Sequence, residues 1–251
     1  MNYRVRRIIS VLALLLGLAT WLIANPANYE TTPSTASPDA ESGAVDPLGV
    51  STDLDSSSKA TNPDTKLAKV ILEQLEVKGR APKTGYSREE FYKTWPNING
   101  CSLRQIIIKR EVGDSAILDG CDVVAGTFVE PYTGQTFTAT KKSDFSNHIQ
   151  IDHVVALSDA WQKGASIKTK EERYAMATDP LNLLAVDGNA NQQKSDGDAA
   201  TWLPPNKAFR CQYVARQVSV KYKYGLWVTE AEHDAIASVL ENCPNEPTVG
   251  I

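Results

Sequence analysis

The chain has 251 residues, with 26 Lys and Arg against 30 Asp and Glu, so its formal net charge is −4. Most of the acidic excess lies in residues 25–65, which hold seven acidic residues and one lysine, whereas residues 66–251 hold 22 basic and 23 acidic residues. This balance excludes a domain that binds nucleic acid by bulk attraction; such binding would need a local basic face.

The N-terminal part predicts export. Arg4, Arg6 and Arg7 precede a largely apolar run, so residues 1–24 are predicted to be a secretory signal peptide or, since no clear cleavage site follows, an N-terminal membrane anchor. Residues 25–65 are rich in Ser, Thr, Pro and Asp and cannot bury enough apolar surface to offset their ordering entropy, which predicts a disordered linker. Residues 66–251 are long enough for one domain with a sizeable core.

The first half of this domain predicts helices and a hairpin. Apolar spacing predicts a helix over residues 66–77, and a basic loop over 79–87 follows it. Ser87 and Glu90 resemble a capping box that opens a short helix to Trp95. A helix is predicted over 101–112, and two β-like runs at 123–129 and 135–139 predict a hairpin. The cations at the loop are either solvated or in contact with phosphates: Lys78, Arg80, Lys83 and Arg88.

The second half predicts two strands that flank an inserted helix, followed by more helices. The strands are expected over 148–156 and 181–186, the insertion over 169–178, and a helix begins within 189–198. A long helix from Pro205 to about Tyr224 precedes a last one over 229–241, which opens with a capping box of Thr229 and Glu232. On the long helix, one face is expected to pack (Phe209, Tyr213, Val220, Tyr224), and an adjacent stripe is either solvated or in contact with DNA backbone (Lys207, Arg210, Lys221).

Four cysteines agree with an oxidising compartment. Three pairings are possible, and we favour Cys101–Cys121 with Cys211–Cys243 because each pair brackets a local unit. No Cys-x-x-Cys spacing is present, which disfavours a zinc-thiolate site, and paired cysteines disfavour a Cys-His hydrolase. Phosphate-binding glycine motifs and H-E-x-x-H are also absent from the sequence.

Three short motifs lie in the two-strand region: Asp152-His153, Asn182-Leu183 and Asn191-Gln-Gln-Lys194. This ordered set resembles the HNH endonucleases, which carry a ββα-metal finger. The likeness covers roughly residues 66–243. Further stretches resemble the secreted bacterial branch of that family: residues 78–87, the helix after Cys101, Pro131–Gly134, Ala160-Trp161, Trp202–Pro205 and Tyr213–Ala215. The resemblance implies an α+β fold, with the finger embedded in a mainly helical single domain that has a small antiparallel sheet.

The catalytic candidates are His153 and Asn182. A histidine with an ordinary pKa near ~6.5 is substantially neutral at pH 7 and can take a proton from water. The Asn182 amide would hold the imidazole in place without adding a charge; its alternative is a turn cap after Pro180. The other histidines, His148 and His233, are expected to be surface and structural residues.

The metal candidates are Asp152 and Asn191, whose oxygen atoms suit Mg²⁺, with Mn²⁺ as a substitute. Asn189 competes with Asn191 for the role of second ligand. Neighbours on a regular strand point to opposite faces, so Asp152 and His153 can serve one site only if the strand twists or ends there, or if the phosphate lies between them.

Further candidates would bind substrate. Arg104 matches an arginine of the resembling family and would hold DNA phosphate or the active-site acids, or form a surface ion pair. Lys194 would contact phosphate or an acid on the finger. With Lys207 and Arg210 these residues complete the predicted substrate-binding set.

The sequence therefore predicts an exported, monomeric endonuclease that uses one Mg²⁺-type ion and acts on DNA with little sequence specificity, with RNA left open. No protein partner is implied, and membrane contact is limited to residues 1–24 if they are not cleaved. The alternatives are a catalytically silent module that binds nucleic acid or the cell envelope, and a hydrolase of another phosphodiester.

Overall fold

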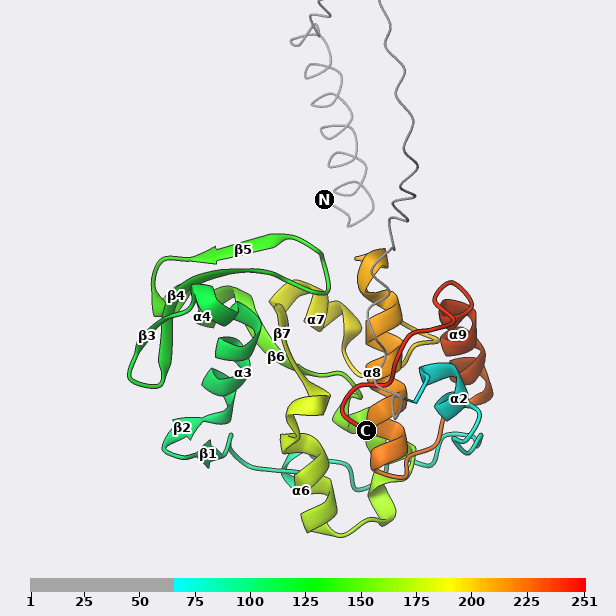
Figure 1. Ribbon diagram of the computed structural model, residues 1–251. Coiled ribbons are helices and arrows are strands. Elements are labelled where there is room, and N and C mark those ends of the chain that lie inside the picture. Colours follow the sequence, from blue (N-terminus) through cyan, green and yellow to red (C-terminus); the bar gives the residue numbers. More distant parts are fainter. Residues whose placement is uncertain (1–65) are drawn as a thin grey trace, which may run out of the picture. The chain divides into compact units, whose positions relative to one another are not determined.

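The structure, a computed structural model, describes residues 66–251 (Figure 1). The predicted signal or anchor and the predicted linker lie outside the described residues. Within them, helices combine with three small antiparallel sheets, which confirms the α+β prediction. No helix in this described part is long and apolar enough to cross a membrane.

The helices and strands have the following bounds. The helices are α2 (Ala68–Leu72), α3 (Leu103–Val112), α4 (Lys142–His148), α5 (Leu157–Gln162), α6 (Lys170–Thr178), α7 (Gly188–Lys194), α8 (Arg210–Lys223) and α9 (Glu230–Leu240). The strands are β1 (Asn97–Ile98), β2 (Cys101–Ser102), β3 (Ile117–Asp119), β4 (Asp122–Val129), β5 (Thr136–Ala139), β6 (Ile149–His153) and β7 (Leu183–Asp187). Short 3-10 turns lie at Arg88–Glu90, Gly113–Ser115, Ala165–Ile167, Pro180–Asn182 and Lys207–Phe209.

Strands β6 and β7 pair antiparallel and α7 follows β7 directly, as the two-strand prediction requires. Asp152 lies opposite Leu184 and His153 opposite Leu183, so β6 ends at the histidine and is shorter than predicted. The Asp187 side chain accepts a hydrogen bond from the Ala190 N–H at the start of α7. This helix ends at Lys194 rather than continuing to residue 198, because Ser195 takes a left-handed φ of 53°.

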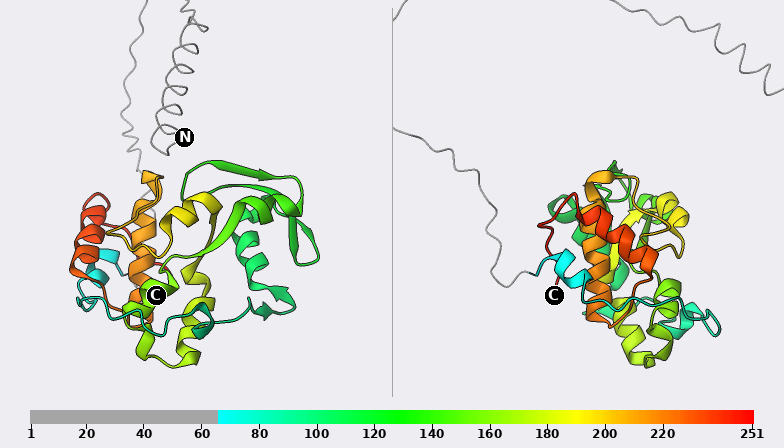
Figure 2. Two further views of the ribbon diagram at one scale, coloured as in Figure 1. Left: turned by 180° about the vertical axis from the view of Figure 1, so that it is seen from behind. Right: turned by 90° about the vertical axis from the view of Figure 1, so that its right-hand side faces the viewer.

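Helix α8 lies between the β6–β7 pair and the helices α2 and α9 (Figures 1 and 2). Its predicted apolar face does pack: Tyr213 and Val220 are fully buried, although they belong to two different core clusters. Lys221, predicted to lie on the polar stripe, is also fully buried. That part of the prediction is wrong because α8 is covered on several sides, so no solvated stripe runs along its whole length.

The sheet β3–β4–β5 lies at the opposite end of the domain from α9 (Figures 1 and 2). The β4–β5 hairpin was expected from the sequence, whereas β3 and α4 were not. Ser87 makes no capping hydrogen bond, so the capping box predicted there is wrong. Thr229 does cap α9 through the Glu232 N–H, but the Glu232 carboxylate points into the core instead of closing the box.

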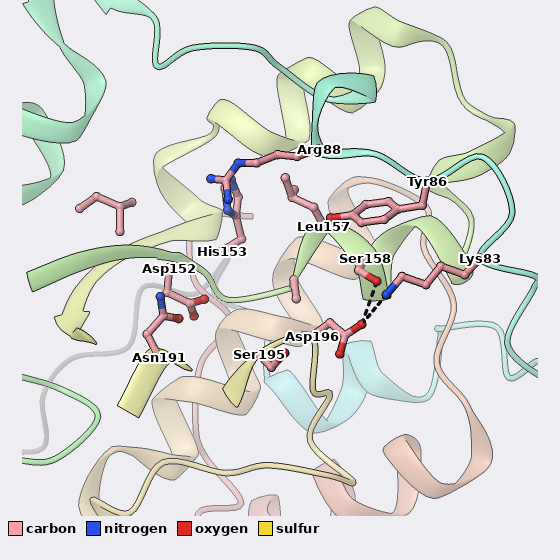
Figure 3. Close-up of a pocket in the computed structure, with 12 residues that line it drawn as sticks. Lys83, Tyr86, Arg88, Asp152, His153, Leu157, Ser158, Asn191, Ser195 and Asp196 are labelled. Carbon is pink, nitrogen blue, oxygen red and sulfur yellow. Dashed lines mark hydrogen bonds and ion pairs between the residues drawn. The ribbon is translucent and has the colours of Figure 1, made fainter. Parts of the chain in front are cut away.

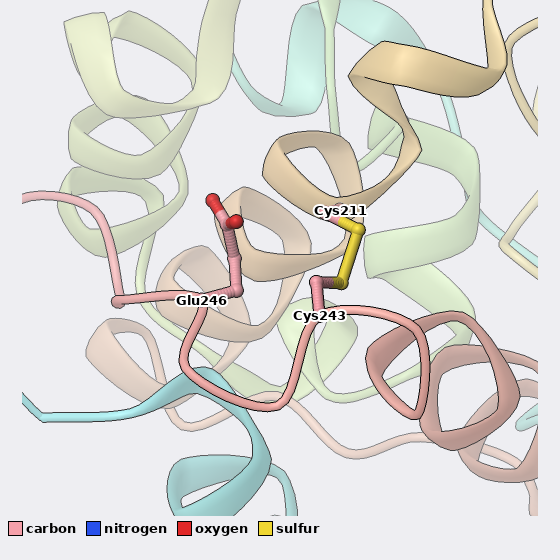
Figure 4. A group of neighbouring side chains, drawn as sticks. All are labelled: Cys211, Cys243 and Glu246. Carbon is pink, nitrogen blue, oxygen red and sulfur yellow. A yellow bond between two sulfur atoms is a disulfide. The ribbon is translucent and has the colours of Figure 1, made fainter. Parts of the chain in front are cut away.

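Both favoured disulfides are present, Cys101–Cys121 and Cys211–Cys243. The second joins the start of α8 to the segment after α9, beside Glu246 (Figure 4). Cys211, Cys243 and Glu246 also form a group of potential metal ligands within the described residues. Because both sulfurs are in the disulfide, this group has no thiolate to offer and we assign no metal to it.

Six charged side chains gather where five segments of the chain meet, five of them buried and Arg80 about one-third exposed; we call this group the charge cluster. The Lys163 Nζ lies 2.7 Å from Asp159 Oδ1, 2.7 Å from Asp198 Oδ2 and 2.6 Å from Glu232 Oε2. Three cations thus balance three carboxylates, as buried charges require. The members are Arg80, Asp159, Lys163, Asp198, Lys221 and Glu232.

The charge cluster should make the domain sensitive to acid. Burial acts to raise the pKa of Asp198, but the hydrogen bond and charge of Lys163 and the charge of Arg80 outweigh it and lower the pKa to about 2, below the ordinary 3.8. A lowered folded-state pKa adds stability that is fully present above the unfolded-state pKa and is lost as the pH falls through the folded one. The free energy of unfolding should therefore fall between pH ~4 and ~2.

Urea unfolding at stepped pH tests this. For Asp198→Asn, the free energy of unfolding should depend less on pH over that range than it does for the wild type. Asp122→Asn, which alters an exposed pair with Lys142, is the control and should show the pH dependence of the wild type. Parallel curves for wild type and Asp198→Asn down to pH ~2 would contradict the assignment.

Candidate active site

A pocket of about 360 Å³ opens at the end of β6 (Figure 3). Both residues of the Asp-His pair line it, and they leave the strand in different directions, Asp152 toward α7 and His153 toward Arg88. The strand ends at this point, so two side chains on opposite faces reach one cavity. The lining is completed by Lys83, Tyr86, Arg88, Ile151, Ala156, Leu157, Ser158, Asn191, Ser195 and Asp196.

The His153 imidazole is held by one hydrogen bond and two aromatic rings. Its Nε2 lies 2.9 Å from the Ala177 carbonyl oxygen. Because a carbonyl only accepts, Nε2 carries the hydrogen and Nδ1 keeps the lone pair of the neutral ring. The Trp95 ring stacks on the imidazole at 5.8 Å and 8°, and Tyr92 lies 5.8 Å away on a tilted plane. Burial lowers the pKa of His153 to about 3, so the ring is neutral at pH 7.

The Asp152 carboxylate lies in a buried hydrogen-bond network. Its Oδ1 accepts from Lys194 Nζ at 2.9 Å, and its Oδ2 accepts from the Tyr132 hydroxyl. Burial raises the pKa of Asp152, and Lys194 and Tyr132 oppose that shift. Burial and the nearby carboxylate raise the pKa of Tyr132 well above its ordinary value, so this phenol stays protonated and keeps donating.

Tyr132 is placed by the turn between β4 and β5. The buried Glu130 side chain accepts from the Tyr132 N–H at 2.7 Å and from the Thr133 N–H at 2.8 Å, which closes the turn. Gly134 ends it at a positive φ of 75°, which favours glycine. The Pro131–Gly134 stretch noted in the sequence therefore delivers a hydroxyl to the Asp152 carboxylate, a role that its residue types alone did not indicate.

Two predicted substrate-binding residues serve the fold instead. The Lys194 ammonium is buried, and besides Asp152 it donates to the His153 carbonyl oxygen at 2.9 Å. Of its two predicted partners, the acid on the finger is the one observed. Arg104 donates to the Ile149 carbonyl oxygen at 2.9 Å and holds the start of β6. It does not line the pocket and pairs with no described carboxylate; its Nη2 is directed to the Ile149 and Phe145 carbonyl oxygens.

Asn182 acts on the backbone rather than on the imidazole, so the predicted direct contact with His153 is wrong. Its Oδ1 accepts from the Val155 N–H at 2.8 Å, and its Nδ2 donates to the Val155 carbonyl at 3.3 Å and to the Met176 carbonyl at 3.5 Å. These bonds fix the chain just after His153 to the end of α6, where Ala177 holds the ring. Asn182 thus positions the histidine indirectly, through the backbone of Val155 and of Met176, which precedes Ala177.

Asn191 lines the pocket beside Asp152, whereas Asn189 is exposed and does not line it. The Asn191 Nδ2 donates to Gln150 Oε1 at 2.8 Å, which leaves its Oδ1 as a free oxygen toward Asp152 (Figure 3). Each Asp152 oxygen accepts one hydrogen bond and retains a further lone pair. This all-oxygen set is of the kind that would suit a hard cation such as Mg²⁺, and Lys194 already neutralises the carboxylate.

Two cations of the basic loop reach the pocket, Lys83 and Arg88. Lys83 Nζ pairs with Asp196 Oδ2 at 3.0 Å, so its charge is largely balanced. Arg88 donates to the Tyr92 hydroxyl, and its guanidinium lies 5.1 Å from the centre of that ring, above His153 (Figure 3). No carboxylate among residues 66–251 forms an ion pair with Arg88, which makes it the pocket cation available to an anion. The sequence marked this loop as basic but did not separate Arg88 from its neighbours.

Lys207 and Arg210 do not line this pocket; they lie together in a second cavity, between α8 and α9. Of the other histidines, His148 is exposed and His233 lies 3.6 Å from Glu73 and from Asp234.

Comparison with known proteins adds two matches. Residues 120–239 match the family described as "GmrSD restriction endonucleases, C-terminal domain". The chain is also 37% identical, over 185 residues, to an "Uncharacterized secreted protein" of Arthroderma benhamiae, covering 72% of this chain and 87% of that protein. The chain belongs to one family with this secreted protein, and its residues 120–239 are similar to the GmrSD C-terminal domain. No solved structure matches it.

The part matched to the GmrSD C-terminal domain family contains β6, β7 and α7, with Asp152, His153, Asn182 and Asn191. Lys83 and Arg88 lie before it and reach the same pocket from outside the matched range. The bacterial branch named from the sequence stays a prediction, since the matched relative does not bear on it.

Tyr132→Phe tests the support of Asp152. The change removes one buried donor and keeps the ring, so it should cost about 1–3 kcal/mol in the free energy of unfolding, because a buried carboxylate oxygen loses its partner. Tyr222→Phe, at a partly exposed phenol, is the control and should cost less than about 0.5 kcal/mol. Equal unfolding midpoints for the two variants would show that the Tyr132 hydroxyl does not hold Asp152.

Proposed function

We propose that this chain is an exported HNH-type endonuclease that hydrolyses phosphodiester bonds of DNA with the help of one Mg²⁺-type ion. The observation that carries the proposal is the pairing of a neutral, tautomer-fixed His153 with the oxygen atoms of Asp152 and Asn191 in one pocket. The family description, which names restriction endonucleases, supports a nuclease. The secreted relative and the two disulfides support export.

Each residue has a defined task in this proposal. His153 Nδ1 accepts a proton from the attacking water, while the Ala177 carbonyl keeps Nε2 protonated and the ring in position. Arg88 contacts a non-bridging phosphate oxygen, for which a guanidinium is suited. Asp152 and Asn191 would hold the ion, which when bound supplies charge stabilisation to the phosphoryl group and the departing oxygen. Activity on RNA and on other phosphodiesters stays open.

The first test removes the base. His153→Ala should lower the rate of plasmid cleavage by about 10²–10⁴-fold, because it takes away proton transfer but no ion ligand. The exposed His148→Ala is the matched control and should cleave at the wild-type rate. A folded His153→Ala protein that cleaves at the wild-type rate would overturn the mechanism. If the wild type itself cleaves nothing under any ion, the silent binding module becomes the better explanation.

The second test concerns the ion. EDTA should abolish cleavage, Mg²⁺ and Mn²⁺ should restore it, and Zn²⁺ should restore little, since it prefers nitrogen and sulfur ligands. Asn191→Ala should raise the Mg²⁺ concentration needed for half-maximal rate and weaken Mn²⁺ binding measured directly by electron paramagnetic resonance. Asn189→Ala, at the exposed competitor, is the control for both readouts. Full activity in EDTA, or best activity in Zn²⁺, would show that the ion site is misassigned.

A further inference from the structure

The cavity between the start of α8 and α9 holds two cations and has a volume of about 650 Å³. Its lining contains Lys207 and Arg210 but no Asp or Glu. Neither cation forms an ion pair with any described carboxylate. Glu246 lies near the disulfide that borders the cavity but does not line it (Figure 4). The remaining lining is small, apolar or neutral: Ala199, Ala200, Leu203, Cys211, Ala235, Ser238, Val239 and Asn242.

The Arg210 guanidinium is fixed without being neutralised. Its Nε donates to the Pro204 carbonyl oxygen at 2.8 Å, which sets the plane of the group and leaves the terminal nitrogens as donors. Lys207 is exposed on the turn that precedes α8. A guanidinium held in one plane beside a mobile ammonium suits an anion with several oxygen acceptors, which describes a phosphate.

One short loop separates this cavity from the candidate active site. Ser195 and Asp196 line the active-site pocket, and Ala199 and Ala200 line the second cavity. Consecutive Cα atoms are about 3.8 Å apart, so the Cα atoms of Asp196 and Ala199 are at most about 11 Å apart. The two cavities are therefore neighbours along this loop.

We propose that the Lys207–Arg210 cavity binds a backbone phosphate of the nucleic acid at a distance from the cleaved bond. The inference rests on the proposed nuclease function and adds a second contact to it. It explains how a domain with almost no net charge can retain a long substrate: Arg88 holds the reacting phosphate, and Lys207 and Arg210 hold the strand beyond it.

The test measures the salt dependence of binding. Full-length protein in the His153→Ala background is titrated with a duplex of about 20 base pairs at stepped salt concentrations. Lys207→Gln with Arg210→Gln should weaken binding about tenfold at low salt and reduce the slope of log K against log salt by about 1, since one lost phosphate contact lowers the slope by about 0.9. Lys69→Gln with Lys109→Gln removes the same charge from two exposed sites outside both pockets and is the control.

A small substrate separates binding from catalysis. In the active background, bis(p-nitrophenyl) phosphate occupies only the catalytic pocket, so the double variant should lose rate on the duplex and not on this ester. Equal slopes for variant and control, or equal losses on both substrates, would overturn the inference. Lys207→Gln alone, which breaks no hydrogen bond within the described residues, keeps the test valid if the loss of Arg210 impairs folding. A wild type that neither binds nor cleaves the duplex refutes the proposed function itself.

Discussion

The buried charge cluster is the interaction on which the positions of both pockets depend. Its carboxylates neighbour both cavities in the sequence: Asp159 follows Ser158 of the active-site pocket, and Asp198 lies between Asp196 of that pocket and Ala199 of the second cavity. Lys163 ties these segments to Glu232 of α9, and Arg80 ties the N-terminal loop to the same point. Because a broken member would leave an uncompensated buried charge, the cluster holds these segments in one arrangement.

The two residues of the Asp-His pair are held in place by contacts with different partners. Asp152 is held on one face of β6 by Lys194 and Tyr132, from α7 and the β4–β5 turn. His153 is held on the other face by the Ala177 carbonyl and the Trp95 ring. Each support comes from a different part of the chain. The end of β6 therefore presents an imidazole and a carboxylate to one cavity, each already held in position.

The cations show where sequence reasoning was strong and where it was not. The basic loop was recognised, and it does bring Lys83 and Arg88 to the pocket. Lys194 and Lys221, equally basic in the sequence, are buried as partners of carboxylates that lie 42 and 62 residues away in the chain. The sequence does not indicate whether a lysine is exposed to solvent, contacts a phosphate or pairs with a buried acid. That choice depends on contacts between distant segments.

The sequence by itself determined the α+β class, the pairing of two strands before a short helix, the candidate residues Asp152, His153 and Asn191, and the favoured disulfides. The strands and the helix follow from local periodicity, the α+β class and the candidate residues from the motifs that resemble the HNH endonucleases, and the favoured disulfides from cysteine pairs that each bracket a local unit. Only the tertiary structure decided that Asn182 fixes backbone rather than imidazole, that Tyr132 supports Asp152, and that Lys207 and Arg210 share a cavity away from His153. These outcomes depend on which distant groups satisfy each buried donor and acceptor, and packing of the whole chain sets that assignment.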